Sequence, residues 1–173
     1  MTEQVLPLTM FYSGWAAYQQ NLVNVIAPLS PAQLALPASS HHWTLGMIAQ
    51  HIVANRVWWF QVWMGEGRPE LDPITHWDPA DKVEQPALDA AELVAGLDAT
   101  WSMIAAALAR WTPADLGRIF PSPSRLSEEE QRIFGERTRQ WIIWHVLEHE
   151  IHHGGELSLA LGNYELEGIY GNA

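Results

Sequence analysis

Apolar residues spaced three and four apart constrain this chain more than any other feature, because that spacing is typical of helices. The first such set contains five residues: Phe11, Trp15, Tyr18, Leu22 and Val25. On a helix, residues with this spacing share one face. We therefore predict a helix with one buried face from about Leu8 to Ile26.

Two further helices have recognisable start and stop signals. Thr44 is a suitable N-cap for a helix that continues until Gly65 interrupts it. Asp89 can cap a third helix that ends at Trp111. The segment between them, residues 68–86, is rich in proline and aspartate, which predicts a long irregular loop.

The C-terminal part of the chain predicts a fourth helix. Ser127 and Glu130 have the spacing of a capping box, but Gly135 interrupts the helix that they begin. The continuous part is therefore expected to begin near Glu136 and to run to Gly162. No segment shows the sustained alternation of a β-strand. The fold class is thus all-α, a four-helix bundle, and 173 residues suit one domain that spans residues 1–173.

Composition excludes several classes of function. The chain has no cysteine, which removes disulfides and protein thiolates, so any metal must be held by His, Asp or Glu. The net charge of −11 opposes binding to nucleic acid or to anionic lipid. The N-terminus lacks the pattern of a signal peptide, and no apolar run is long enough for a membrane span. We expect a cytoplasmic protein that does not bind membranes.

Histidines are concentrated in one short segment. Residues 145–156 read H-V-L-E-H-E-I-H-H-G-G-E and carry four of the eight histidines and three glutamates. Residues four apart on a helix can bind one ion, which allows the pair His145 and His149 or the pair His149 and His153. The apolar stripe of this helix decides between the pairs, because it contains His153 and is flanked by His149. The stripe is formed by Ile142, Val146, Leu157 and Ala160.

A third histidine is predicted to face this pair. His51 lies in an apolar stripe of the second predicted helix, together with Met47, Ala54, Trp58 and Val62. By itself, one histidine on an apolar face is more often a core residue bonded to a carbonyl. Opposite a pair of histidines, it becomes a third metal ligand. Three neutral nitrogens plus water form an open site of the catalytic type.

The remaining histidines and the glutamates of this segment are expected to be less central. His145 and His152 are interpreted as surface, interface or supporting groups, and the histidines at 41, 42 and 76 lie in connectors. Glutamates 148, 150 and 156 are read as helix-face carboxylates. Glu148 or Glu156 is a candidate to orient a ligand or to act as a base. No catalytic residue is assigned.

Two metal motifs compete with this interpretation. Residues 149–153 match H-E-x-x-H, the zinc-peptidase signature in which the glutamate activates water. There is no downstream histidine with metzincin spacing, and no strand to pair with a peptide. Glu150 and His153 also match half of a di-iron motif, but the second E-x-x-H is missing. We favour a site for one ion and keep the peptidase as an alternative.

Nearly the whole length of the chain resembles the DinB/YfiT-like superfamily. The resemblance rests on the first helix, on W-T-L-G-M-I-A-Q-H at residues 43–51 and on E-H-E-I-H-H-G-G-E-L at residues 148–157. It implies an up-down-down-up four-helix bundle, usually a homodimer, that holds zinc or nickel through His51, His149 and His153. A basic residue that often follows the second histidine of the pair is replaced here by Gly154.

The resemblance also implies a class of reaction. Related proteins include mycothiol-dependent maleylpyruvate isomerase and bacillithiol or glutathione S-transferases. We expect a metal-dependent S-transferase or isomerase that uses a low-molecular-weight thiol and a small-molecule substrate. The alternative is a non-enzymatic dimeric module that binds a metal or a small molecule.

Overall fold

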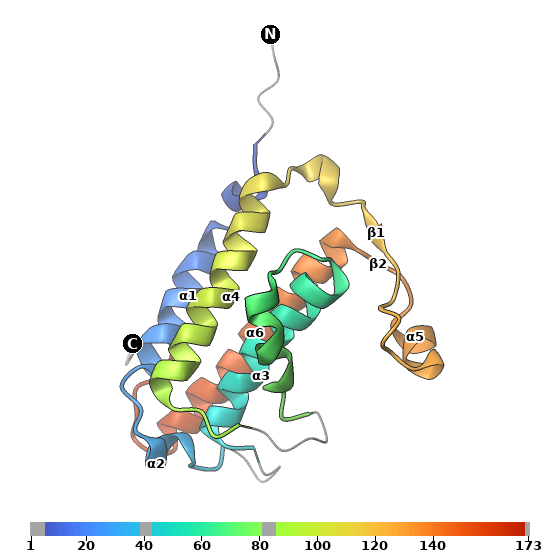
Figure 1. Cartoon of the computed structure of the whole chain (residues 1–173). Helices are drawn as coiled ribbons and strands as arrows, with labels where there is room; N and C mark the ends of the chain where they lie inside the picture. Colours follow the sequence, from blue (N-terminus) through green and yellow to red (C-terminus); the bar gives the residue numbers. More distant parts are fainter. Residues whose placement is uncertain (1–5, 39–42, 81–85, 172–173) are drawn as a thin grey trace.

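A computed structural model describes residues 6–38, 43–80 and 86–171, and the protein is mostly helical. The four longest helices are α1 (Ser13–Ile26), α3 (Leu45–Val57), α4 (Ala90–Arg110) and α6 (Arg139–Gly162). Shorter helices join or extend them: η1 (Leu8–Met10), α2 (Pro31–Leu34), η2 (Trp58–Trp63), η3 (Pro69–His76), η4 (Pro113–Asp115) and α5 (Glu128–Phe134). Figure 1 shows the four long helices side by side.

Most of the predicted helix starts are confirmed. At each confirmed start, a side chain accepts a hydrogen bond from a backbone N–H that the helix leaves free. Thr44 Oγ1 accepts from the backbone N–H of Met47 at the start of α3. Asp89 and Glu92 form a reciprocal capping box at α4. Ser127 and Glu130 do the same at α5, and α5 ends where Gly135 adopts a φ of 60°.

The first helix begins later than the spacing of apolar residues predicts. A short 3₁₀ turn, η1, occupies Leu8–Met10, and α1 starts only at Ser13. Phe11 lies in the turn between them and is 61% exposed, so its assignment to the buried face is wrong. The other four residues of that set are buried.

The second predicted helix is continuous but changes its winding. It runs as α3 and then as the π-helix η2, and Gly65 follows with a φ of 74°. α3 packs against both α4 and α6, so residues on most of its sides are buried. The single apolar stripe predicted for this helix is wrong as its buried face, because Ala54 is its one buried member and Met47, His51, Trp58 and Val62 are only partly buried. His51 lies on its partly buried side, facing α6.

The apolar helix α4 is explained by packing. It is long and apolar enough, by length and composition, to cross a membrane, which differs from the sequence expectation. Its apolar residues Leu93, Leu97, Ile104 and Leu108 are at most 1% exposed in the core of the protein. A core helix that packs against α1 and α3 accounts for this composition.

An arm, residues 116–138, projects from the long helices (Figure 1). Two short antiparallel strands, β1 (Ile119–Phe120) and β2 (Arg137–Thr138), form its stem, so the expectation of no strand is wrong here. Helix α5 carries no buried residue. The ring of Phe134 contacts Trp59 and Trp63 of η2, with centroids 6.2 and 6.0 Å apart.

The predicted loop 68–86 contains the 3₁₀ helix η3.

Candidate metal site

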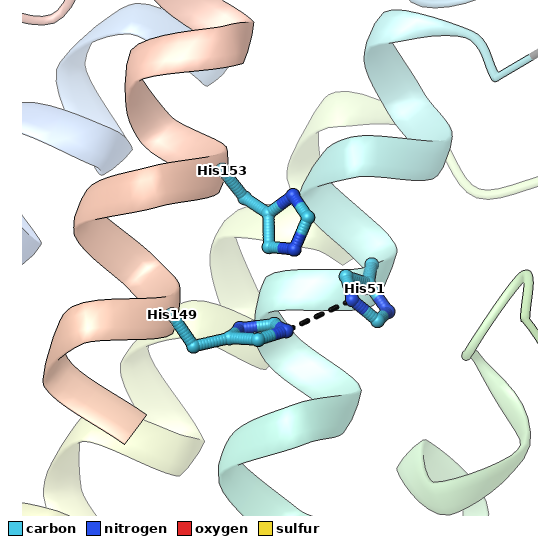
Figure 2. A group of neighbouring side chains, drawn as sticks. All are labelled: His51, His149 and His153. Carbon is cyan, nitrogen blue, oxygen red and sulfur yellow. Dashed lines mark hydrogen bonds between the residues drawn. The ribbon is translucent and has the colours of Figure 1, made fainter. Parts of the chain in front are cut away.

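The three histidines predicted as ligands converge between α3 and α6. His51 projects from α3, and His149 and His153 project from successive turns of α6 (Figure 2). One nitrogen of each ring lies within 4.8 Å of the others. The Nε2 atoms of His51 and His149 are 2.9 Å apart. In a tetrahedral site, two nitrogens that bind one ion at about 2.0–2.1 Å are roughly 3.3 Å apart. This separation lies between the 2.9 Å and the 4.8 Å found here.

Two carboxylates orient two of the rings. Asp78 Oδ1 lies 2.7 Å from Nδ1 of His51, and Glu156 Oε2 lies 2.8 Å from Nδ1 of His153. With the proton on Nδ1, each ring donates to its carboxylate and leaves a lone pair on Nε2. This is the arrangement that fixes the tautomer of metal-binding histidines in proteins. The donor set therefore fits a divalent ion.

Burial keeps two of the site histidines, His149 and His153, neutral. Burial, followed by the nearby rings of His51 and His153, lowers the pKa of His149 to about 2. Burial also lowers the pKa of His153, although the hydrogen bond to Glu156 opposes this shift. Both imidazoles are therefore uncharged at neutral pH, the form that binds metals. Nδ1 of His149 is buried and has no hydrogen-bond partner among the described residues.

Comparisons with known proteins identify the family. A family model of the DinB superfamily matches residues 15–157. The chain belongs to the DinB superfamily. A solved DinB-like protein from Bacillus cereus ATCC 10987 shares 18% identity, with a TM-score of 0.63 over 94% of this chain and 96% of that chain. No curated protein matches the chain. The DinB match includes all three histidines of the site.

Gly154 lies where there is no room for a side chain. A Cβ at this position would lie 1.8 Å from the hydroxyl oxygen of Tyr18 and 3.0 Å from Cδ1 of Ile169. Tyr18 is fixed there because its hydroxyl donates to the backbone carbonyl of Glu150, at 3.0 Å. A basic side chain at this position would displace Tyr18, so this DinB protein has no room for one.

The other described histidines stay outside the group of three. His145 stacks on Trp141, with ring centroids 4.7 Å apart and planes inclined by 16°. Its Nδ1 lies 3.9 Å from Oε2 of Glu148. Glu148 therefore lies beside His145 and orients none of the three site histidines. His152 is exposed and lies 3.3 Å from Glu156. His41 and His42 lie outside the described residues.

Glu150 differs most from its sequence interpretation. The sequence predicts a carboxylate on a helix face. In the structure Glu150 is fully buried and forms a bidentate ion pair with Arg56. Arg56 Nε and Nη2 donate to its two oxygens, at 2.7 and 2.9 Å. Trp15 Nε1 donates to the same carboxylate at 2.9 Å. Glu150 therefore points into the core, and its oxygens are occupied.

Sequence reasoning missed two polar groups that matter to this site, Asp78 and Arg56. Asp78 lies in an irregular loop, and its contact with His51 spans 27 residues. Arg56 is separated from Glu150 by 94 residues. A weak signal existed for Arg56, since it falls within the apolar run I-V-A-N-R-V-W-W of residues 52–59. A charge inside such a run predicts a buried, paired side chain.

Proposed function

We propose that this protein binds one divalent metal ion, zinc or nickel, through His51, His149 and His153. The proposal extends to function: a metal-dependent S-transferase or isomerase that uses a low-molecular-weight thiol. The observation that carries it is the convergence of three imidazoles from α3 and α6, with no fourth protein ligand in the group. That statement covers the described residues. Three protein ligands leave a position open for a substrate, as in catalytic zinc sites.

Two groups of residues have different roles in the proposed site: the histidines bind the ion, and two carboxylates orient the histidine rings. The three histidines supply nitrogen ligands without charge, while Asp78 and Glu156 hold two of the rings. When bound, a divalent ion supplies a positive charge that lowers the pKa of a coordinated thiol or water and favours a nucleophile at neutral pH. Because the chain has no cysteine, the thiol must come from a small molecule.

The test begins with metal analysis of untagged protein and continues with thiol chemistry. Metal-loaded and chelator-treated protein are incubated with glutathione, bacillithiol or mycothiol and an electrophile, and loss of free thiol is followed. We expect metal-dependent thiol consumption. If metal binds but no thiol is consumed with any pair, the binding-module alternative replaces the enzyme.

Homodimerisation is part of both candidate functions. Trp144, Ile151 and Leu159 on the outer face of α6 are 60%, 51% and 73% exposed. Apolar side chains aligned on one helix face favour association with a second copy. We expect a dimer mass by light scattering at micromolar concentration, and a monomer mass under those conditions would contradict it.

The peptidase alternative loses support from the position of Glu150. A zinc peptidase uses the glutamate of H-E-x-x-H to activate water beside the ion. Here that carboxylate is held by Arg56 and Trp15 in the core. Casein cleavage by metal-loaded protein that stops after metal removal would favour the peptidase after all.

Membership of the DinB superfamily also supports a proposal for the arrangement of the helices. We infer that α1, α3, α4 and α6 form the up-down-down-up four-helix bundle of DinB/YfiT-like proteins. A net charge of −11 supports a cytoplasmic protein with a small-molecule substrate and without nucleic acid or membrane partners.

Asp78 provides a test of the orienting groups. Asp78→Asn keeps the shape of the side chain but removes its charge, so the ring of His51 is held less firmly. We expect zinc affinity to fall about 10–100-fold, as for other carboxylates that orient a ligating histidine. Competition with a chromophoric chelator measures the affinity. Glu148→Gln, which changes a carboxylate next to His145, is the matched control and should bind zinc like wild type.

A further inference from the structure

A cavity of about 520 Å³ reaches the candidate metal site from the side of the arm. Its wall includes His149, a proposed ligand, and Asp78, which orients His51. α3 and η2 form one side, and the arm contributes Leu126 and Phe134 on the other. A volume in this range suits a small molecule. The arm therefore completes a compartment that reaches the candidate metal site at His149.

Aromatic rings dominate the apolar part of this cavity. Trp58, Trp59, Phe134 and His145 all line it. Three of them are connected through Trp59, whose ring centroid lies 6.2 Å from that of Phe134 and 4.9 Å from that of His145. Such rings favour offset-stacked or edge-to-face contacts with another ring over contacts with a saturated group.

Polar groups also line this cavity. Asn55 is only 9% exposed, lines the cavity one turn after His51, and its Oδ1 has no hydrogen-bond partner among the described residues. A buried acceptor without a partner indicates a site for water or for a ligand group. Two carboxylates also line the wall, but Asp78 contacts His51, and Glu130 accepts from Ser127 in a capping box.

We propose that this cavity binds a planar aromatic or conjugated molecule that carries one carboxylate, with the ring against Trp59 and Phe134 and the carboxylate toward the histidines. The ring preference follows from the aromatic wall. The carboxylate preference rests on the proposed function, because three neutral histidines leave the charge of a divalent ion uncancelled.

A second cavity, of about 380 Å³, reaches His153 from the opposite side. Ala38, Ile48, Leu159 and Ala160 give it an aliphatic wall, and Trp43 adds one aromatic ring. Among its described lining residues, two carry rings, Trp43 and His153, with centroids 6.2 Å apart, against the four rings named above that line the cavity beside the arm. The cavity beside the arm is therefore the compartment to which the planar ligand is assigned.

The experiment compares 2-naphthoate with its saturated analogue, decahydro-2-naphthoate, by calorimetric titration of zinc-loaded and metal-free protein. We expect 2-naphthoate to bind wild type more tightly than the analogue does. Phe134→Ala should weaken 2-naphthoate binding about two- to tenfold, the value of one aromatic pair. Ile133→Ala is the matched control, because Ile133 is the neighbouring residue of α5, is 67% exposed and does not line the cavity.

Phe134→Leu guards against loosening of the arm, since it keeps an apolar side chain and removes only the ring. It should lower the preference for 2-naphthoate over the saturated analogue. Equal binding of the two probes to wild type, or equal 2-naphthoate affinity in wild type and both Phe134 variants, would overturn the proposal even if zinc binds. Ring-dependent binding that is identical with and without zinc would keep the aromatic compartment and overturn the carboxylate's place at the ion.

Discussion

His149→Ala is expected to lower the zinc affinity of this protein by more than about 100-fold, beyond the loss typical of a residue that only orients a ligand. The ring of His149 lies close to both other histidines of the site, with centroids 4.6 Å from His51 and 4.3 Å from His153. Its removal leaves two nitrogens, too few to hold the ion. His51→Ala and His153→Ala should show losses of the same kind. Elemental analysis of untagged protein gives the metal content, about one ion per chain in wild type.

His152→Ala is the matched control for this set, since it removes a neighbouring histidine that is exposed and outside the group of three. It should retain the metal. Circular dichroism checks that each variant is folded. Unchanged metal content in all three site variants would refute the site, and loss confined to His145→Ala or His152→Ala would place the ion on the other side of α6.

Glu150→Gln is expected to lower the free energy of unfolding by about 3–5 kcal/mol, the cost of breaking a buried ion pair by removing one partner. Both side chains of the Arg56–Glu150 pair are fully buried. The substitution leaves the Arg56 charge in the core without an opposing charge, next to the neutral oxygens of Gln19, Leu97, Thr100 and the new amide side chain. Since natural domains are stable by only about 5–15 kcal/mol, this loss is large. Urea unfolding followed by circular dichroism measures it.

Two variants separate the charge effect from a general sensitivity of α6. Glu148→Gln changes an exposed carboxylate of the same helix and should alter stability by no more than about 0.5 kcal/mol. The double variant Arg56→Met/Glu150→Leu removes both charges and should recover part of the loss, because apolar replacements of buried pairs are tolerated. A Glu150→Gln variant as stable as wild type would show that the pair does not hold the core.

The sequence alone determined the features that depend on neighbouring residues. Thr44, Asp89 and Ser127 cap helices because a short polar side chain reaches a backbone N–H three residues away. Gly135 separates α5 from α6 because it adopts a positive φ at low cost. The two candidate histidine pairs of α6 also followed from its local periodicity. These signals act within one or two helical turns, and the sequence contains them in full.

Only the tertiary structure decided which groups meet across the chain. Asp78 contacts His51 because a loop without periodic pattern returns to α3, and no local rule predicts its path. Glu150 lies next to His149 in sequence but projects into the core, since consecutive residues on a helix are about 100° apart. The spacing of apolar residues also missed the 3₁₀ turn that exposes Phe11. The cavity beside the arm joins η2, α6 and α5, so its shape depends on packing between distant segments, which the sequence does not encode locally.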